Sequence, residues 1–214
     1  MGWFTKILDW IFPPRCLFCG QRRSVNEDHL CKECAGIPSE RVYRFFAIHE
    51  RRRAFTLECR STMRYRGEFR STLHRFKFRD ETHLAKPLAK QLFLAIDRDR
   101  TYDCIAAVPV SAERLKERGY DQSELLAKEL SRLTGIPYMA QLTKKTHNRT
   151  QHNLPSSERE RNVRGVYMAE DCTGLRVLLV DDIVTTGATV RECARMLYRA
   201  GADDVGVVCC ALVL

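Results

Sequence analysis

The sequence predicts an α/β fold in which a doubly wound parallel sheet follows a small N-terminal module with four cysteines. Two observations support this prediction. From residue 101 onward, strand and helix patterns alternate, and the strand patterns are nearly continuous apolar runs, which is typical of parallel sheets covered on both faces. Residues 15–38, in contrast, contain few aliphatic side chains and two CxxC pairs. We therefore expect two units, an N-terminal module over residues 1–40 and a sheet domain over residues 41–214.

The N-terminal unit begins with an amphipathic pattern. Residues 3–12 carry apolar side chains at helical spacing until Pro13 and Pro14 end the run. Such a helix suits a membrane surface or a partner protein, although packing against its own domain is the more common role. No uncharged apolar run reaches about 18 residues, and the start lacks the features of a signal peptide. We expect no transmembrane segment, a cytoplasmic location and reduced thiols.

Two CxxC pairs follow, formed by Cys16, Cys19, Cys31 and Cys34. Two thiolates three positions apart on a tight turn can occupy adjacent corners of a tetrahedron, so two such turns complete a closed zinc site. A closed site has a structural role, because no coordination position stays open for a substrate. A redox CxxC or unrelated thiols are the alternative. The remaining cysteines lack metal spacing and are expected to be buried small hydrophobes: Cys59, Cys104, Cys172, Cys193, Cys209 and Cys210.

The elements of the second unit follow from local patterns. A basic and aromatic stretch comes first, and a polar loop occupies residues 145–162. Gly135 is expected to end one helix, and Pro87 places the regular start of another near Lys86. We expect extended segments over 54–65, 103–110, 163–168, 176–184 and 205–214, and helices over 67–78, 82–97, 121–134 and 189–200.

The most specific pattern is the segment over residues 177–189, VLLVDDIVTTGAT. An apolar strand ends in the adjacent carboxylates Asp181 and Asp182, and a loop rich in threonine leads into a helix. Backbone N–H groups of such a loop and the helix N-terminus form a nest for a phosphate, and the acids suit ribose hydroxyls or Mg²⁺. A solvated turn with a helix cap is the alternative. The loop candidates for phosphate binding are Thr185, Thr186, Gly187, Ala188 and Thr189.

This segment resembles the phosphoribosyl pyrophosphate (PRPP) motif of the type I phosphoribosyltransferases. Upstream, residues 108–130 resemble the part of the ComF family that holds an RGxNQ-like signature, present here as Arg118-Gly119-Tyr120-Asp121-Gln122 with Asp where Asn is more usual. RTQHNL at 149–154 and the RNVRG run at 161–165 resemble a later stretch of the same family. The cysteine pairs after FPPRC match as well. The resemblance to the ComF family thus covers four motifs in order.

The resemblance implies roles for particular residues. Asp181 and Asp182 match the pair that holds the ribose 2′ and 3′ hydroxyls of PRPP, and residues 185–189 match the loop around its 5′-phosphate. The ligand would be PRPP or a nucleoside monophosphate, with Mg²⁺ accompanying PRPP. The candidates for the pyrophosphate end are Ser111, Arg114 and Lys116. The candidates for the edge of the site, or for a lid over it, are Arg118, Tyr120, Gln122, Gln151 and Arg161, for which helix capping, surface charge and a solvated loop are the alternatives.

The formal net charge of +9 lies wholly in the first hundred residues. There, residues 44–79 alternate basic side chains with rings, a mixture that single-strand binders use for phosphates and bases. An ordinary solvated basic surface is the alternative, and about half of the rings are expected to be buried. The nucleic-acid candidates are Arg51, Arg52, Arg53, Arg64, Arg66 and Arg70.

Two functions remain open at the level of the sequence. The resemblance to the ComF family implies a PRPP-binding protein that handles single-stranded DNA during competence or an allied process, together with DNA-uptake machinery. The alternative is a magnesium-dependent phosphoribosyltransferase in which Asp181 and Asp182 hold the sugar while an unidentified acceptor displaces pyrophosphate. The sequence contains no evident element for recognising a base as the acceptor.

Overall fold

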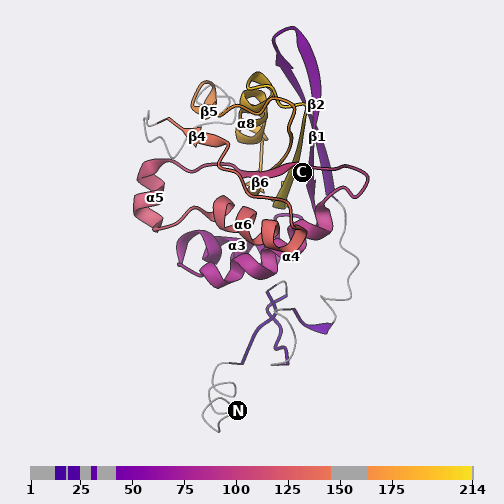
Figure 1. The fold of residues 1–214 in the computed structure, drawn as a ribbon. Coiled ribbons are helices and arrows are strands. Elements are labelled where there is room, and N and C mark those ends of the chain that lie inside the picture. The colour runs from indigo at the N-terminus through magenta and orange to yellow at the C-terminus, as the bar shows by residue number, and fades with distance from the viewer. Residues whose placement is uncertain (1–12, 18, 25–29, 33–41, 146–162, 214) are drawn as a thin grey trace.

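The computed structural model describes residues 13–17, 19–24, 30–32, 42–145 and 163–213 (Figure 1). The helix expected over residues 3–12 and most of the polar loop at 145–162 lie outside these ranges. In the part of the chain that is described, no helix combines the length and the apolar character needed to cross a membrane.

A five-stranded sheet forms the centre of the fold. Its order is β1-β2-β7-β6-β3, from β1 (Val42–Glu50), β2 (Arg53–Ser61), β7 (Asp204–Leu212), β6 (Arg176–Val184) and β3 (Cys104–Ala107). The last four strands run parallel, whereas β1 pairs antiparallel with β2. The expectation of a parallel sheet is therefore right for β2, β7, β6 and β3, but the sheet as a whole is mixed because a hairpin forms one edge.

The hairpin explains why β1 is absent from the predicted elements. Glu50 pairs with Arg53, so only two residues form the turn. Arg51 and Arg52 both have positive φ, at 46° and 63°, as in the mirror-image turns that match the twist of a hairpin. Gly, Asn and Asp usually occupy such positions, so two arginines give no turn signal in the sequence.

Helices cover both faces of the sheet, which confirms the doubly wound arrangement (Figure 1). On one face, α4 (Ala85–Ala95) packs on β7 and β2, and α6 (Gln122–Thr134) packs on α4, β6 and β3. On the other face, α8 (Ala188–Arg199) contacts β1, β7 and β6. The connecting elements are α3 (Gly67–Phe78), η1 (Thr82–Leu84), α5 (Ala112–Arg118) and the strands β4 (Leu142–Lys144) and β5 (Tyr167–Ala169), which pair with each other.

Two apolar clusters fill the spaces between these layers. Phe69, Phe76 and Leu88 belong to the cluster under α3, α4 and α6, and Leu179 and Leu197 belong to the one under α8. All the cysteines that lack metal spacing are buried, as expected: Cys59, Cys104, Cys172, Cys193, Cys209 and Cys210. The strand expected over 163–168 is shorter, because only its end joins β5 and residues 164–165 form a turn.

Candidate functional site

The acid pair lies near the carboxyl end of β6. Ligands of open parallel sheets bind at this edge. Asp181 and Asp182 are both buried within the strand, which continues to Val184. Oδ1 of Asp181 accepts hydrogen bonds from the Ser123 hydroxyl at 3.2 Å and from the backbone N–H of Asp182 at 2.9 Å. Oδ1 of Asp182 accepts from the N–H of Ile183 at 2.7 Å. Local backbone contacts therefore hold both carboxylates in place.

Lys77 supplies the positive charge beside this pair. Its Nζ lies 2.6 Å from Oδ2 of Asp182, from the last turn of α3. Burial and the neighbouring charge of Asp182 raise the pKa of Asp181 to about 7, although Lys77 opposes part of that shift. Sequence reasoning did not place Lys77 here, because α3 and β6 are far apart in the chain and no local pattern joins them.

The loop over residues 185–189 leads from β6 into α8. Gly187 takes a φ of +78° as the residue before the helix, and no side chain caps its N-terminus. The Thr186 hydroxyl accepts a hydrogen bond from the N–H of Ala188 at 3.4 Å, whereas Thr185 is exposed. Burial raises the pKa of Tyr167, and the neighbouring Thr189 side chain opposes part of that rise. A helix N-terminus without a side-chain cap, preceded by a loop of this kind, provides N–H donors for a phosphate group.

Two residues of β1 build the other side of this loop. A Cβ added to Gly187 would lie 2.2 Å from the Phe46 ring, so the close approach that glycine permits is made with this ring. The Arg44 guanidinium donates to the carbonyls of Thr185 and Val213 and lies 5.0 Å from the centroid of the Phe46 ring. Two members of the basic and aromatic stretch therefore support the loop.

The expected pyrophosphate segment lies beside the acid pair. The N–H of Val108 donates to the carbonyl of Val180 at 2.9 Å, so the chain that leaves β3 runs next to the end of β6. Ser111 caps α5 by accepting from the N–H of Arg114 at 3.4 Å. Arg114 and Lys116 are exposed on α5.

Asp121 fixes the two ends of this segment. One carboxylate oxygen accepts from the N–H of Val110 at 2.9 Å, and the other caps α6 by accepting from the N–H of Glu124 at 3.1 Å. The side chain therefore ties the residues after β3 to the start of α6. These two hydrogen bonds are a structural reason for an acidic residue at position 121 of the RGxNQ-like signature.

The other signature residues hold the end of α3. The Tyr120 hydroxyl donates to the carbonyl of Phe76, and Gln122 donates to the carbonyl of Lys77 at 3.5 Å. Arg118 donates to Gln122 at 3.1 Å and lies 4.8 Å from the centroid of the Phe78 ring. Arg118, Tyr120 and Gln122 thus hold the helix that carries Lys77. Gln151 and Arg161 lie outside the described residues.

Three of the four expected zinc ligands are described, and they lie together. The sulfurs of Cys16, Cys19 and Cys31 are all within 4.8 Å of one another, and those of Cys19 and Cys31 are 3.7 Å apart. Zn–S bonds of about 2.3 Å in a tetrahedron place sulfurs about 3.8 Å apart, so these residues fit zinc. Cys34 lies outside the described residues.

The first cysteine pair lies on a tight turn, as a zinc site of this kind requires. The N–H of Gly20 donates to the carbonyl of Cys16, and Gly20 has a φ of +70°. The Leu17 carbonyl accepts from the Thr72 hydroxyl at 2.6 Å, which docks the cysteine module on α3.

The basic candidates for nucleic acid divide into two groups. Arg51, Arg52 and Arg53 surround the hairpin turn, and β2 spans 9 residues, or about 30 Å, before the second group begins. That second group is Arg64, Arg66 and Arg70, and like the first it is exposed. Of the rings in the stretch, Phe46, Phe69 and Phe76 are buried, whereas Phe45 and Phe78 are 62% and 55% exposed. The stretch therefore does not form one continuous surface.

The fold and the acid pair with its loop define a phosphoribosyltransferase-type domain. Residues 118–213 match the family model described as the phosphoribosyl transferase domain. Residues 7–40 match the model described as the double zinc ribbon domain, in agreement with the cysteine geometry.

Comparison with curated proteins confirms the resemblance to the ComF family. The chain is 33% identical over 146 residues to "Competence protein F" of Haemophilus influenzae, which covers 63% of this chain and 64% of that protein. It is 35% identical over 145 residues to "DNA utilization protein YhgH" of Salmonella typhi, which covers 64% of each. The chain thus covers less than two thirds of the length of these relatives. Among solved structures, glutamine PRPP amidotransferase from B. subtilis in complex with ADP and GMP is 30% identical, with a TM-score of 0.40 over 62% of this chain and 26% of that one.

Proposed function

We propose that the chain binds PRPP at the carboxyl end of β6 and takes part in handling single-stranded DNA during competence or an allied process. The observation that carries the PRPP part is the buried acid pair directly before the loop and N-terminus of α8. A sugar phosphate needs hydroxyl acceptors and phosphate donors a few residues apart, and this segment supplies both.

Each part of the site has a proposed task. Asp181 and Asp182 accept hydrogen bonds from the ribose hydroxyls, and residues 185–189 donate to the 5′-phosphate. Lys77 must yield part of its contact with Asp182 when the sugar arrives. Ser111, Arg114 and Lys116 face the pyrophosphate end in this proposal. Mg²⁺ bound with PRPP would offset the charge of the pyrophosphate.

The DNA part rests on relatives and on charge. One relative is named a competence protein and another a DNA utilization protein. The excess of basic residues lies in the first hundred positions. We propose that residues 1–40 and 41–214 act as two units in this task, alongside DNA-uptake machinery. We also propose that they act in the cytoplasm, where cysteine thiols are kept reduced and available for zinc.

Turnover is the second candidate, and one observation favours it. Residues 108–111 leave β3 beside the acid pair, so a place for a departing pyrophosphate adjoins the sugar site. The bond between ribose C1 and the pyrophosphate oxygen would break and a bond from C1 to an acceptor nitrogen would form, while pyrophosphate leaves with the bonding electrons. Release of pyrophosphate from PRPP with a panel of bases and amines tests this reaction directly.

The decisive experiment for the shared element is calorimetric titration of the full chain with PRPP and Mg²⁺. We expect saturable binding by the wild type, loss of binding by Asp181→Asn/Asp182→Asn, and no change for the exposed control Asp171→Asn. If the wild type does not bind, both candidate functions fail. Binding without pyrophosphate release with any acceptor favours the first candidate.

A further inference from the structure

An exposed aromatic ring lies at the end of α3, next to the acid pair. Phe78 is the last residue of this helix and directly follows Lys77, whose Nζ contacts Asp182. Phe78 is 55% exposed, and Phe45 is the only described phenylalanine that exceeds this value. Nucleobases stack on aromatic rings that are presented in this way, because every base has a flat π-face.

Two side chains hold the Phe78 ring in its position. The guanidinium carbon of Arg118 lies 4.8 Å from the ring centroid, and the centroid of the His74 ring lies 4.7 Å away, with the two rings inclined at 44°. A guanidinium next to an aromatic ring is attracted by the quadrupole of the ring. The ring is therefore ordered before a ligand arrives, which lowers the entropic cost of binding.

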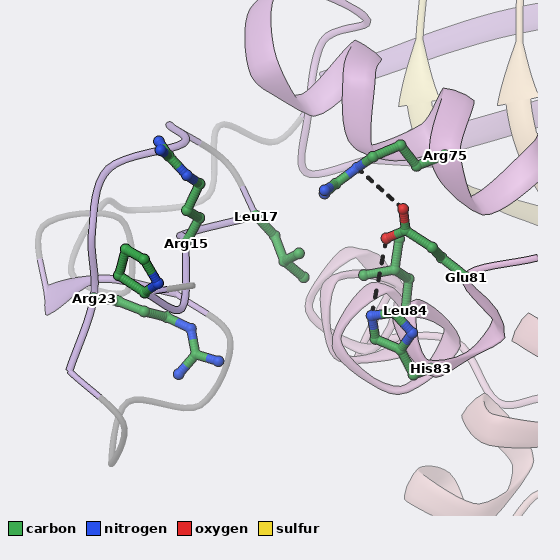
Figure 2. Close-up of a pocket in the computed structure, with 8 residues that line it drawn as sticks. Arg15, Leu17, Arg23, Arg75, Glu81, His83 and Leu84 are labelled. Atoms are coloured by element: carbon green, nitrogen blue, oxygen red, sulfur yellow. Dashed lines mark ion pairs between the residues drawn. The ribbon is translucent and has the colours of Figure 1, made fainter. Parts of the chain in front are cut away.

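Arg118 is itself held by neutral groups. Its Nη1 donates to the side-chain oxygen of Gln122 at 3.1 Å, and its Nε is buried without a hydrogen-bond partner among the described residues. Arg75 on α3 differs, because its Nε faces the carboxylate of Glu81 at 3.8 Å, in the cavity beside the cysteine module (Figure 2). The position of Arg118 is thus set by the ring and by an amide, and not by an ion pair.

The electrostatic surroundings of Arg118 favour a ligand with electronegative atoms. Burial lowers the pKa of Arg118, the charge of Arg114 adds to this effect, and Asp182 and Glu117 offset only part of it. The guanidinium stays charged at neutral pH, because an arginine does not lose its proton in a protein. A carbonyl oxygen of a base, or a phosphate oxygen, would stabilise this cation.

A short series of contacts joins the ring to the acid pair. Gln122 accepts from Arg118 and donates to the carbonyl of Lys77 at 3.5 Å, so one side chain touches both. Lys77 in turn contacts Asp182. In a nucleotide the hydroxyls and the base are attached to the same ribose ring. A ribose at Asp182 and a base at Phe78 are therefore compatible with one ligand.

Phe45 is an exposed ring without these surroundings. Successive side chains of a strand point to opposite faces, so Phe45 points away from the face on which Arg44 and Phe46 support the loop over residues 185–189. The residue directly across the hairpin from Phe45 is Glu58. An acid at this position disfavours a ligand that carries a phosphate. Phe45 thus offers a matched control for Phe78.

We propose that Phe78 is the base-binding residue of the site, so that the base of a nucleotide stacks on its ring while Asp181 and Asp182 hold the ribose. Arg118 keeps the ring in position and donates to the base. The inference rests on the proposed PRPP site and gives it an element for recognising a base, which the sequence did not indicate. The ligand class is a nucleoside 5′-monophosphate or, in a transfer reaction, a heteroaromatic acceptor base.

The test compares ligands with and without a base. Ribose 5-phosphate, PRPP, GMP, UMP and AMP are titrated calorimetrically into the zinc-loaded full chain. We expect at least one nucleotide to bind at least fivefold more tightly than ribose 5-phosphate, which is the low end for a base stacked on an aromatic side chain. Phe78→Ala should remove this advantage and change the affinities for ribose 5-phosphate and PRPP less than twofold, since the acid pair is intact.

Matched variants separate the ring from general effects of substitution. Phe45→Ala should keep the full advantage of the nucleotide. Phe78→Tyr should also keep it, whereas Phe78→Leu, which is apolar without a ring, should lose most of it. Arg118→Gln should reduce the advantage, and Arg132→Gln, which removes an exposed arginine paired with Glu129 on α6, should not. Unchanged zinc content and circular dichroism in each variant show that the fold persists.

The outcomes distinguish this inference from the proposed function. If no nucleotide binds more tightly than ribose 5-phosphate, or if Phe78→Ala keeps the advantage, Phe78 does not bind the base, whereas binding of PRPP still supports the proposed function. If Phe78→Ala leaves nucleotide binding unchanged but weakens binding of a labelled oligothymidylate in fluorescence anisotropy, the ring serves DNA and the inference is wrong. If the wild type binds neither ribose 5-phosphate nor PRPP, the proposed function fails and the inference fails with it.

Discussion

Nζ of Lys77 on α3 lies 2.6 Å from Oδ2 of Asp182 on β6. The contact joins a helix of the basic stretch to the strand that carries the acid pair, and Tyr120 and Gln122 hold the helix end in the position that allows it. The side chains are 24% and 10% exposed, so water screens this ion pair only in part. The pair therefore bears on both stability and ligand binding.

Removing this lysine should cost stability. Lys77→Met leaves a nearly buried carboxylate without its cation, and we expect a loss of about 1–3 kcal/mol, between the values for exposed and buried pairs. Urea unfolding measures it. The exposed Lys86→Met on α4 is the control and should change stability by less than about 0.5 kcal/mol. If Lys77→Met matches this control, the contact contributes nothing to folding.

Asp181 predicts a pH dependence. Its pKa rises from the ordinary 3.8 to about 7 in the folded chain, so the folded state holds the proton more tightly than the unfolded state does. The stability linked to that proton is fully present below pH 4 and is lost as the pH rises through 7. Asp181→Asn keeps an acceptor for Ser123 and removes the titration.

The measurement is the urea midpoint at several pH values for the wild type and Asp181→Asn. The variant should be more stable at pH 8 by at least about 1 kcal/mol, and its advantage should shrink toward pH 4. Taking the difference between the two chains removes the histidines and other groups that titrate in the same window. An advantage that is constant with pH would contradict the raised pKa.

Replacement of Gly187 in the loop should destabilise the fold more than replacement of a glycine in open space. In Gly187→Ala the new Cβ lies 2.2 Å from the Phe46 ring, in addition to the strain of a φ of +78°. Gly174→Ala is a matched control, because its φ is +74° and nothing lies within 4 Å. We expect a cost of about 1 kcal/mol for the control and at least about 2 kcal/mol for Gly187→Ala. Adding Phe46→Leu to Gly187→Ala should recover part of the difference in stability. If it recovers none, the contact with the Phe46 ring is not the cause of the loss.

Replacement of Asp121 by asparagine should destabilise the fold. Asp121→Asn places an NH2 donor against one of two backbone N–H donors, Val110 or Glu124, so one loses its acceptor. We expect a loss of about 1–2 kcal/mol in thermal unfolding. Ser111→Ala, which removes a longer and more exposed cap, should cost less. An equal or smaller effect of Asp121→Asn would show that the Val110 contact is unimportant.

Zinc should be needed for the module rather than for the sheet. Native mass spectrometry should find one zinc per chain. The zinc should be lost in Cys16→Ser and kept in Cys172→Ser, because Cys172 is buried but does not belong to the cysteine cluster. Chelation should expose the amides around Leu17 to hydrogen exchange, because zinc binding contributes about 10–16 kcal/mol to the folding of small modules of this kind. Protected amides in metal-free protein would contradict the zinc assignment.

The success of the sequence prediction depended on local signals. The helix over 67–78 and the strand over 176–184 were predicted with their observed bounds, because each is one apolar pattern with clear ends. β1 was missed, since its exposed positions include the rings of Tyr43 and Phe45, which remove the alternation of apolar and polar residues that indicates a strand. Its turn also lacks glycine or asparagine. α5 was missed because none of its residues is buried, so it shows no apolar period.

The candidate site also divides into a local part that the sequence predicted and a long-range part that it did not. The acids and the loop lie in one continuous segment, so their spacing was visible in the sequence. Lys77, Arg44 and Phe46 reach the segment from α3 and β1, more than a hundred residues away. Such long-range contacts depend on the packing of whole elements, and the spacing of these residues in the sequence does not indicate them.

The sheet order has a consequence for how the chain folds during synthesis. β2 pairs with β7, and Glu58 lies opposite Gly206, so the ribosome must add roughly 150 further residues before this pair can form. Until then β2 has an open edge toward the missing strand, a template on which another chain could add. Glu58 and Arg60 carry charge along that strand, and charge on an edge discourages such pairing. A late closing step of this length predicts slow refolding with high contact order and greater aggregation for chains stopped before β7.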